Sequence, residues 1–73
     1  MFLNIREAEF ATGINRKTIH KHIRDGVLDS EGRKIEEREL YAWAVDRWRE
    51  GRCLMYPPEQ IQRRLEHLYE RRR

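Results

Sequence analysis

Apolar side chains recur at helical spacing along most of the chain, and turn-forming residues separate the stretches in which they recur. The first stretch follows Asn4, which can cap a helix, and Glu7 stands at the third helical position to complete a capping box. Thr12-Gly13 ends the stretch, because glycine readily takes the positive φ of a helix end. The pattern predicts a short helix through residue 11, with an inner stripe of Ile5, Ala8 and Ala11, joined by Ile14 beyond the turn.

A second short helix is predicted over residues 15–24. Asn15 is a good N-cap, and Asp25-Gly26 ends the helix. Ile19 and Ile23 stand four residues apart and share one face, while the other face carries polar cationic side chains: Arg16, Lys17, His20, Lys21 and Arg24. Two short helices joined by a glycine-containing turn have the layout of a helix-turn-helix.

Residues 27–35 predict a small β-hairpin, since two short extended pieces flank a polar loop that contains Gly32. Leu28 and Ile35 are its expected inward contacts. Residues 36–50 predict a third helix, with glutamates near its start and arginines near its end, as the helix dipole favours. Gly51 ends this helix.

The third helix has a wider apolar face than one neighbour needs. Leu40, Trp43 and Ala44 can close the helix-turn-helix core, which leaves a second apolar set for another neighbour: Tyr41, Val45 and Trp48. We expect that neighbour to be a helix that begins at Pro57-Pro58 and carries a coiled-coil-like seam of Ile61, Leu65 and Leu68. Because so short a helix is marginal alone, it must pack on the third helix, on a second copy of the chain, or on both.

Length and composition fit one small domain. The chain has 73 residues, of which 38% are hydrophobic and 40% charged, and no apolar run approaches the ~20 residues of a membrane span. Because its start lacks the features of a secretory signal, we expect a cytoplasmic protein. Cys53 is the single cysteine, expected to be a reduced, partly buried small hydrophobe rather than a nucleophile. The expected parts are residues 1–50, a connector over 51–57 and an amphipathic helix over 58–73.

The net charge is +3, and its distribution is more informative than its size. Residues 15–24 carry four cations and no acid, whereas residues 29–50 carry five cations and seven acids, and residues 57–73 carry five cations and three acids. A local concentration of positive charge is typical of a nucleic-acid-binding surface. A solvated charged face is the alternative interpretation.

The order of these parts resembles the winged helix-turn-helix of the excisionase and MerR-like superfamily. The resemblance spans residues 3–48 and is carried by short motifs in a fixed order: Arg6-Glu7-Ala8, the run from Gly13 to Ile19, Ile23-Arg24-Asp25-Gly26, Ile35, and Leu40 with Trp43. It implies a mainly α fold, with three helices and a short β-hairpin wing, to which the C-terminal helix is an addition.

The resemblance also implies binding of double-stranded DNA, with the second helix in the major groove and the wing at the backbone or minor groove. Carried over residue by residue, it places one set of side chains of the second helix against DNA: Asn15, Arg16, Lys17, His20, Lys21 and Arg24. Arg33 and Lys34 would be the wing contacts. This wing departs from the family pattern, because it is short and carries Asp29 and Glu31.

Position along the second helix suggests different roles for its side chains. Arg16 and Lys17 stand in the first turn, which points into the groove in such helices, and we expect them to reach base edges. Lys21 and Arg24 stand further along and are expected to bind phosphates. Thr18 either contacts a phosphate or caps the helix locally.

The histidines do not form a metal-binding pattern. His20 is expected to face outward and offer a hydrogen bond to DNA, whereas His22, beside the isoleucine stripe, is expected to be a packed structural residue. The two side chains are about 200° apart on a helix, so they cannot both bind one ion. His67 and Cys53 follow no metal spacing, and no metal or other cofactor is expected.

Catalytic motifs are also absent from the sequence, and we expect a protein that is not an enzyme. Glu36 and Glu37 stand side by side at a helix start, where the dipole explains them. Trp43 and Trp48 stand on a wide amphipathic helix, which favours core packing over stacking on bases.

The sequence as a whole predicts a sequence-specific double-stranded DNA-binding protein, a phage or plasmid repressor or an excisionase-like factor. A DNA-recognition small subunit of a terminase is the alternative within DNA binding. A protein-interaction module that binds an acidic partner is the alternative of another class. We expect a homodimer, held by Ile61, Leu65 and Leu68 together with Trp48 on the spare face of the third helix.

Overall fold

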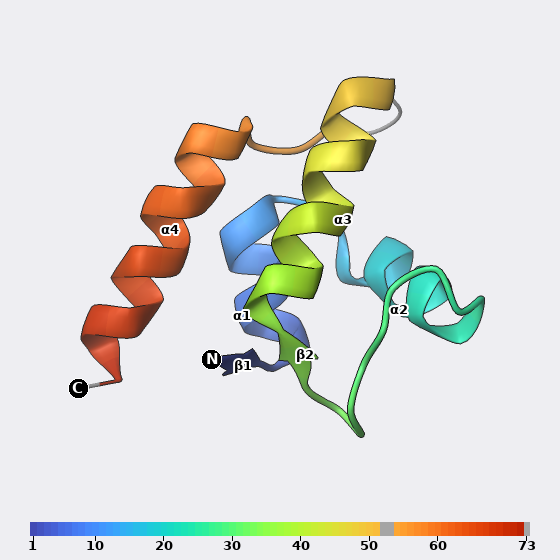
Figure 1. The fold of residues 1–73 in the computed structure, drawn as a ribbon, viewed down its shortest axis with the longest axis horizontal. Helices are drawn as coiled ribbons and strands as arrows, with labels where there is room; N and C mark the ends of the chain where they lie inside the picture. The colour runs from blue at the N-terminus through green and yellow to red at the C-terminus, as the bar shows by residue number, and fades with distance from the viewer. Residues whose placement is uncertain (52–53, 73) are drawn as a thin grey trace.

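The computed structural model describes residues 1–51 and 54–72, so Cys53 and the environment expected for it lie outside the described residues. Four helices and a two-stranded antiparallel sheet make up this part of the chain (Figure 1). In chain order the elements are β1 (Phe2–Leu3), α1 (Ile5–Thr12), α2 (Arg16–Arg24), β2 (Ile35–Glu36), α3 (Glu37–Glu50) and α4 (Pro58–Arg71).

The two longest helices, α3 and α4, have 14 residues each. Within the described ranges no helix combines the length and the apolar character that crossing a bilayer requires.

The helix ends follow the local signals in the sequence. Asn4 Oδ1 accepts from the Glu7 N–H at 2.8 Å and Glu7 Oε1 accepts from the Asn4 N–H at 3.0 Å, so the predicted capping box is confirmed. Gly13 ends α1 with φ 74°, and Asn15 caps α2. The third helix begins one residue later than predicted, because the Glu36 carboxylate accepts from backbone N–H groups and serves as its N-cap.

The predicted hairpin over residues 27–35 is wrong in its strand pairing. Ile35 of β2 pairs with Leu3 of β1. Between α2 and β2 the chain forms only a tight turn, in which Glu31 and Lys34 exchange backbone hydrogen bonds of 2.8 and 3.1 Å. A hairpin with strands of two or three residues has too few hydrogen bonds to be stable, whereas β1 brings its own buried Leu3. Leu28 and Ile35 are buried, as predicted.

The C-terminal helix α4 completes the same core as α1, α2 and α3. It packs on α1 and α3, and Ile61, Leu65 and Leu68 are 0%, 7% and 6% exposed within the single chain. Of the alternatives open for this helix, packing on the third helix is confirmed, and α1 and α3 cover these three side chains within one chain. Their part in a homodimer stays a prediction. Trp48 is 45% exposed, and its role in a dimer stays a prediction.

The segment that leads into α4 packs against the turn between α1 and α2. The Tyr56 N–H donates to the Thr12 carbonyl oxygen at 2.9 Å, and the Tyr56 ring lies against Gly13. The Arg64 guanidinium lies between the rings of Phe10 and Tyr56, at 4.0 and 4.3 Å from their centroids. The end of α1 is therefore clamped by residues more than 40 positions away in the sequence.

We predict that Gly13→Ala lowers the free energy of unfolding by about 2 to 4 kcal/mol. A Cβ atom there would lie 3.0 Å from the Tyr56 ring, and the φ of 74° is strained for alanine, so crowding adds to backbone strain. Urea unfolding measures the loss. Gly26→Ala is the matched control, because Gly26 has φ 77° but an added Cβ there meets nothing within 4 Å. Equal losses in both variants would show that the Tyr56 contact is unimportant.

Candidate nucleic-acid interface

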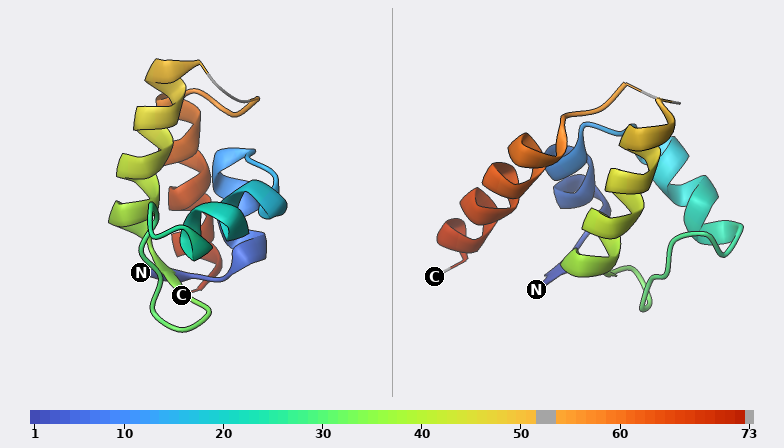
Figure 2. Two further views of the ribbon diagram at one scale, coloured as in Figure 1. Left: turned by 90° about the vertical axis from the view of Figure 1, so that its right-hand side faces the viewer. Right: turned by 45° about the horizontal axis from the view of Figure 1, so that its top comes forward.

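The second helix lies at one end of the molecule, where it packs on α1 and crosses beside α3 (Figure 2). Ile19 is fully buried and Ile23 is half-buried, so the predicted apolar face is confirmed. Because an α-helix turns about 100° per residue, the side chains of Lys17, Lys21 and Arg24 lie about 160°, 200° and 140° from Ile19. These three cations therefore point away from the core.

All three side chains of this outward face are exposed. Within residues 1–51 and 54–72 no hydrogen bond or ion pair engages the charged groups of Lys17, Lys21 or Arg24. The prediction that cations cover the exposed face of this helix is confirmed. The protein thus holds a compact set of unpaired positive charges on a fixed helix, a geometry suited to an extended anion.

The flank of α2 nearest α1 carries Arg16 and His20, both exposed. His20 lines a hollow together with Asn4, the N-cap of α1, with Ile5 of α1 and with Arg33 from the tight turn. Arg33 and Lys34 are exposed on that turn. The structure therefore brings Arg33 to the same side of α2 as His20, although the turn is much smaller than a paired wing.

The backbone N–H groups at the start of α2 already have partners. Asn15 Oδ1 accepts from the Lys17 N–H at 2.8 Å, and Glu9 Oε2 of α1 accepts from the Arg16 N–H at 2.9 Å. The Thr18 and Ile19 N–H groups donate to the Asn15 carbonyl oxygen. Side chains, and not free N–H groups, must therefore bind an anion here. The Asn15 side-chain oxygen is engaged as a cap, which leaves its NH₂ group for the predicted DNA contact.

The opposite flank of α2 carries Thr18 and His22, four residues apart and both half-buried. The Trp43 Nε1–H of α3 donates to His22 Nδ1 at 3.2 Å, and Arg47 Nη1 lies 3.0 Å from His22 Nε2. His22 is thus a packed residue, as predicted. No sequence pattern predicted the contact of His22 with Arg47, because the helix dipole alone explains an arginine near the end of α3.

The environment of His22 favours its neutral form. Burial lowers the pKa of His22 below 6.5, and the positive charges of Arg47 and Lys21 lower it further, against weaker opposing effects of Asp25 and Glu50. Trp43 and Arg47 carry only donors, whereas a protonated imidazole has no lone pair to accept from either. Protonation would therefore weaken the attachment of α2 to α3.

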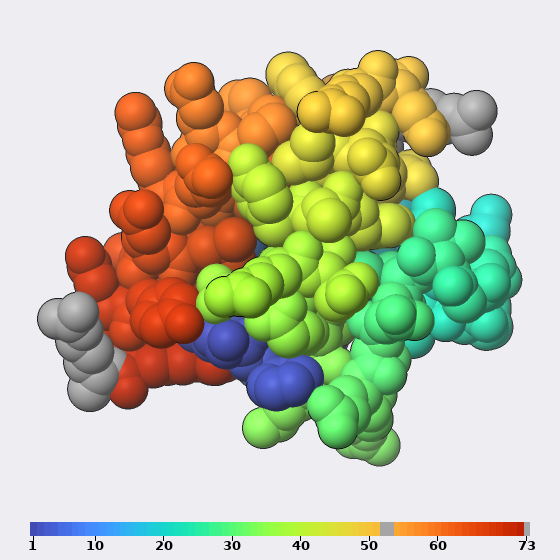
Figure 3. Space-filling model, viewed as in Figure 1, coloured from blue at the N-terminus to red at the C-terminus, as the bar shows by residue number. Residues whose placement is uncertain are grey.

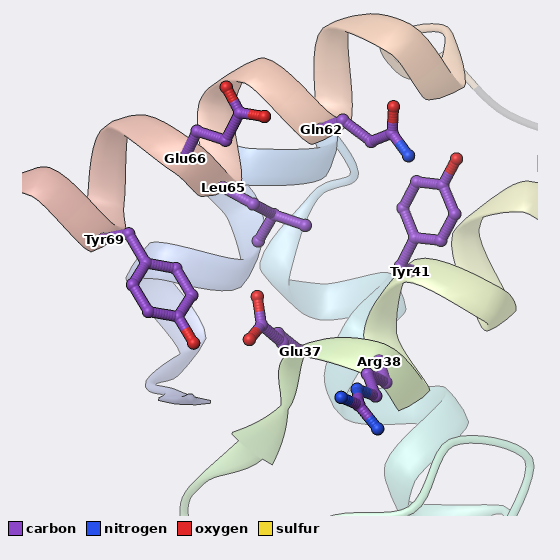
Figure 4. Close-up of a pocket in the computed structure, with 7 residues that line it drawn as sticks. All are labelled: Glu37, Arg38, Tyr41, Gln62, Leu65, Glu66 and Tyr69. Atoms are coloured by element: carbon purple, nitrogen blue, oxygen red, sulfur yellow. The ribbon is translucent and has the colours of Figure 1, made fainter.

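The groove on the other side of α3, toward α4, has a different chemistry (Figure 4). Glu37, Glu66 and the hydroxyl groups of Tyr41 and Tyr69 line it, together with Arg38. A hydrogen bond to Glu37 raises the pKa of Tyr69. The carboxylates make this groove unsuited to nucleic acid, so the candidate interface is the side of the molecule formed by α2.

Comparison of the chain with protein-family models, with curated proteins and with solved structures finds no match in any of the three. The winged helix-turn-helix resemblance therefore stays a prediction. The structure itself supplies a mainly helical fold with a small antiparallel sheet.

We predict that protein stability falls as the pH drops below about 6.5, and that His22→Gln reduces this fall. The folded protein keeps His22 neutral at pH values where the unfolded chain is protonated, so unfolding takes up a proton. The stability that neutral His22 contributes is then fully present above its pKa in the unfolded chain and is lost as the pH falls toward its pKa in the folded protein. Urea unfolding between about pH 7.5 and pH 5 measures the slope.

The control for this measurement is His20→Gln, at an exposed position on the other flank of α2. It should keep the pH profile of the parent protein. Parallel profiles for the parent and for His22→Gln would disprove the role given to His22.

Proposed function

We propose that this protein binds double-stranded DNA through α2, with the outward face of that helix in the major groove. The observation that carries the proposal is the set of three unpaired cations, Lys17, Lys21 and Arg24, opposite the buried Ile19. An α-helix with its side chains is about 10 to 12 Å across, and the major groove is about 12 Å wide, so the nine-residue α2 can enter the groove.

The attachments of α2 support the same function. Ile19 holds the helix on the core, Glu9 holds its first N–H group, and Trp43 holds His22 on the far flank. A helix fixed on three sides loses little conformational freedom when it binds, which favours a defined register on the duplex. The superfamily resemblance supports a small regulator, a repressor or an excisionase-like factor, as the context in which it acts.

Lysine at position 21 is proposed to contact a phosphate. We therefore expect Lys21→Gln to weaken binding to all duplexes about equally and to reduce the slope of log affinity against log salt by about 1. Fluorescence anisotropy with a random-sequence duplex at several salt concentrations measures both. Arg49→Gln is the matched control, because Arg49 is an exposed cation on α3 and its loss changes the net charge equally.

Two results would contradict this proposal. One is the absence of any binding to duplex at low salt, which favours a protein partner for the basic helix. The other is an equal effect of the Lys21 and Arg49 substitutions. It would show that α2 contributes only general electrostatic attraction and no specific phosphate contact.

Arginine at position 16 is proposed to read a base edge from the flank of α2. Arg16→Ala should relax sequence preference and cost about 1 to 3 kcal/mol at the preferred site. Alanine keeps the backbone N–H that donates to Glu9, so the helix start is preserved. Selection of bound sites from a random duplex pool, for the parent and the variant, measures the preference. Identical selected sites for the parent and the variant would show that Arg16 does not read a base.

A further inference from the structure

The charged residues of α4 are sorted onto its two flanks. Glu66 and Tyr69 stand on the flank that faces α3, where Figure 4 shows them with Glu37. The flank that faces α1 carries Gln60, Arg63, Arg64 and His67, which line a groove together with Glu59. Arg71 follows His67 one turn further along the helix. The α1-facing flank of α4 is therefore the more basic of the two, although it also carries Glu59.

A groove of about 560 Å³ lies between α1 and the basic flank of α4. Arg63, Arg64 and His67 line it, with Glu59 as its one carboxylate among the described lining residues. Arg63 and Arg71 are exposed, and neither forms an ion pair within residues 1–51 and 54–72. The groove thus keeps a positive charge that the protein does not neutralise internally.

Arg64 is held in a fixed position at this groove. Its guanidinium stacks between the rings of Phe10 and Tyr56, and its Nε–H donates to the Phe10 carbonyl oxygen. The two terminal nitrogen atoms have no partner among the described residues, so their N–H groups remain for an external acceptor. A guanidinium ordered in advance loses little side-chain entropy when it binds an anion.

The basic groove and α2 lie on either side of α1. On α1, Glu9 reaches the start of α2 and Phe10 lies against Arg64 of α4, while the exposed Arg6 stands between these two directions. Figure 3 shows α3 on one broad face of the molecule, and the left view of Figure 2 shows α1 on the side away from α3. One exposed cation, Arg6, therefore stands between α2 and the groove, beside the Glu9 carboxylate that accepts from the Arg16 N–H.

The dimensions match one turn of duplex. The molecule is 33 Å long, with α2 near one end and α4 near the other (Figure 1), and a turn of B-DNA is about 34 Å. We propose that the groove between α1 and α4 binds the phosphate backbone of the same duplex, flanking the segment that α2 contacts. This inference rests on the proposed function of α2.

The observations favour backbone phosphates over bases or an acidic peptide. Arg64 covers the Phe10 ring, so that ring is not free to stack on a base. The cations at positions 63, 64 and 71 are spread along the helix and not gathered at one point, which suits a linear array of phosphates. Because Arg6 stands between these cations and those of α2, both sets can contact one extended ligand.

The test compares two duplexes centred on the segment that α2 contacts. The short one has about 6 base pairs closed by a hairpin loop, covers about 20 Å and cannot span the 33 Å of the molecule, and the long one has about 25 base pairs. The variant combines Arg63→Gln with Arg71→Gln, which leaves the stacked Arg64 in place. We expect it to bind the long duplex about tenfold more weakly than the parent, with a salt slope smaller by about 2, and to bind the short duplex equally well. The control combines Arg38→Gln with Arg49→Gln, two exposed cations of α3, and should match the parent on both duplexes.

The outcomes separate this inference from the proposed function. If the parent binds duplex and the double variant behaves like the parent or like the α3 control, the proposed role of the groove is wrong. The proposed role of α2 then still stands. Equal weakening on both duplexes also overturns the inference about the groove, because the contact would then not be flanking. A third result also overturns the inference: a poly-glutamate peptide binds the parent through Arg63 and Arg71, while the double variant binds the long duplex like the parent. The groove would then bind an acidic protein. A parent that binds no duplex overturns both.

Discussion

The packing of α4 on α1 and α3 is the interaction on which the rest of the structure depends. The helices α1 and α2 have eight and nine residues, lengths that are marginal in isolation, and a chain of 73 residues buries too little surface to leave a helix outside its core. Ile61, Leu65 and Leu68 close the side of the core that α2 does not reach. Without them, α1 would lose its cover and the support of α2 with it.

The packing of α4 on α1 also brings some opposite charges together and leaves the cations of α2 apart from acidic side chains. The Arg72 side chain pairs with Glu7 and donates to the Phe2 carbonyl oxygen, so the end of α4 is tied to the start of α1. The exposed acids of α3, such as Glu39 and Asp46, stand on a different helix from the cations of α2. Mutual repulsion among those cations lowers stability, and an anionic ligand would relieve it.

Local signals predicted the helices well, whereas long-range contacts were beyond their reach. Asn4, Gly13 and Asn15 act on backbone groups within three residues, so their spacing alone marks the helix ends. The pairing of Ile35 with Leu3 joins positions 32 residues apart, and no turn between them specifies it. A seam such as that of α4 has the same pattern whether it packs within the chain or on a second copy, so periodicity could not choose between them.

The candidate site divides in the same way. The exposure of Lys17 and Lys21 followed from helical periodicity around Ile19, but the basic groove depends on Arg64 meeting Phe10 across 54 positions of sequence. Arg64 also stacks on Tyr56, and Tyr56 lies against Gly13 in the turn that precedes α2. Arg64 therefore connects the basic groove with the turn that precedes α2, a contact that no local pattern in the sequence specifies.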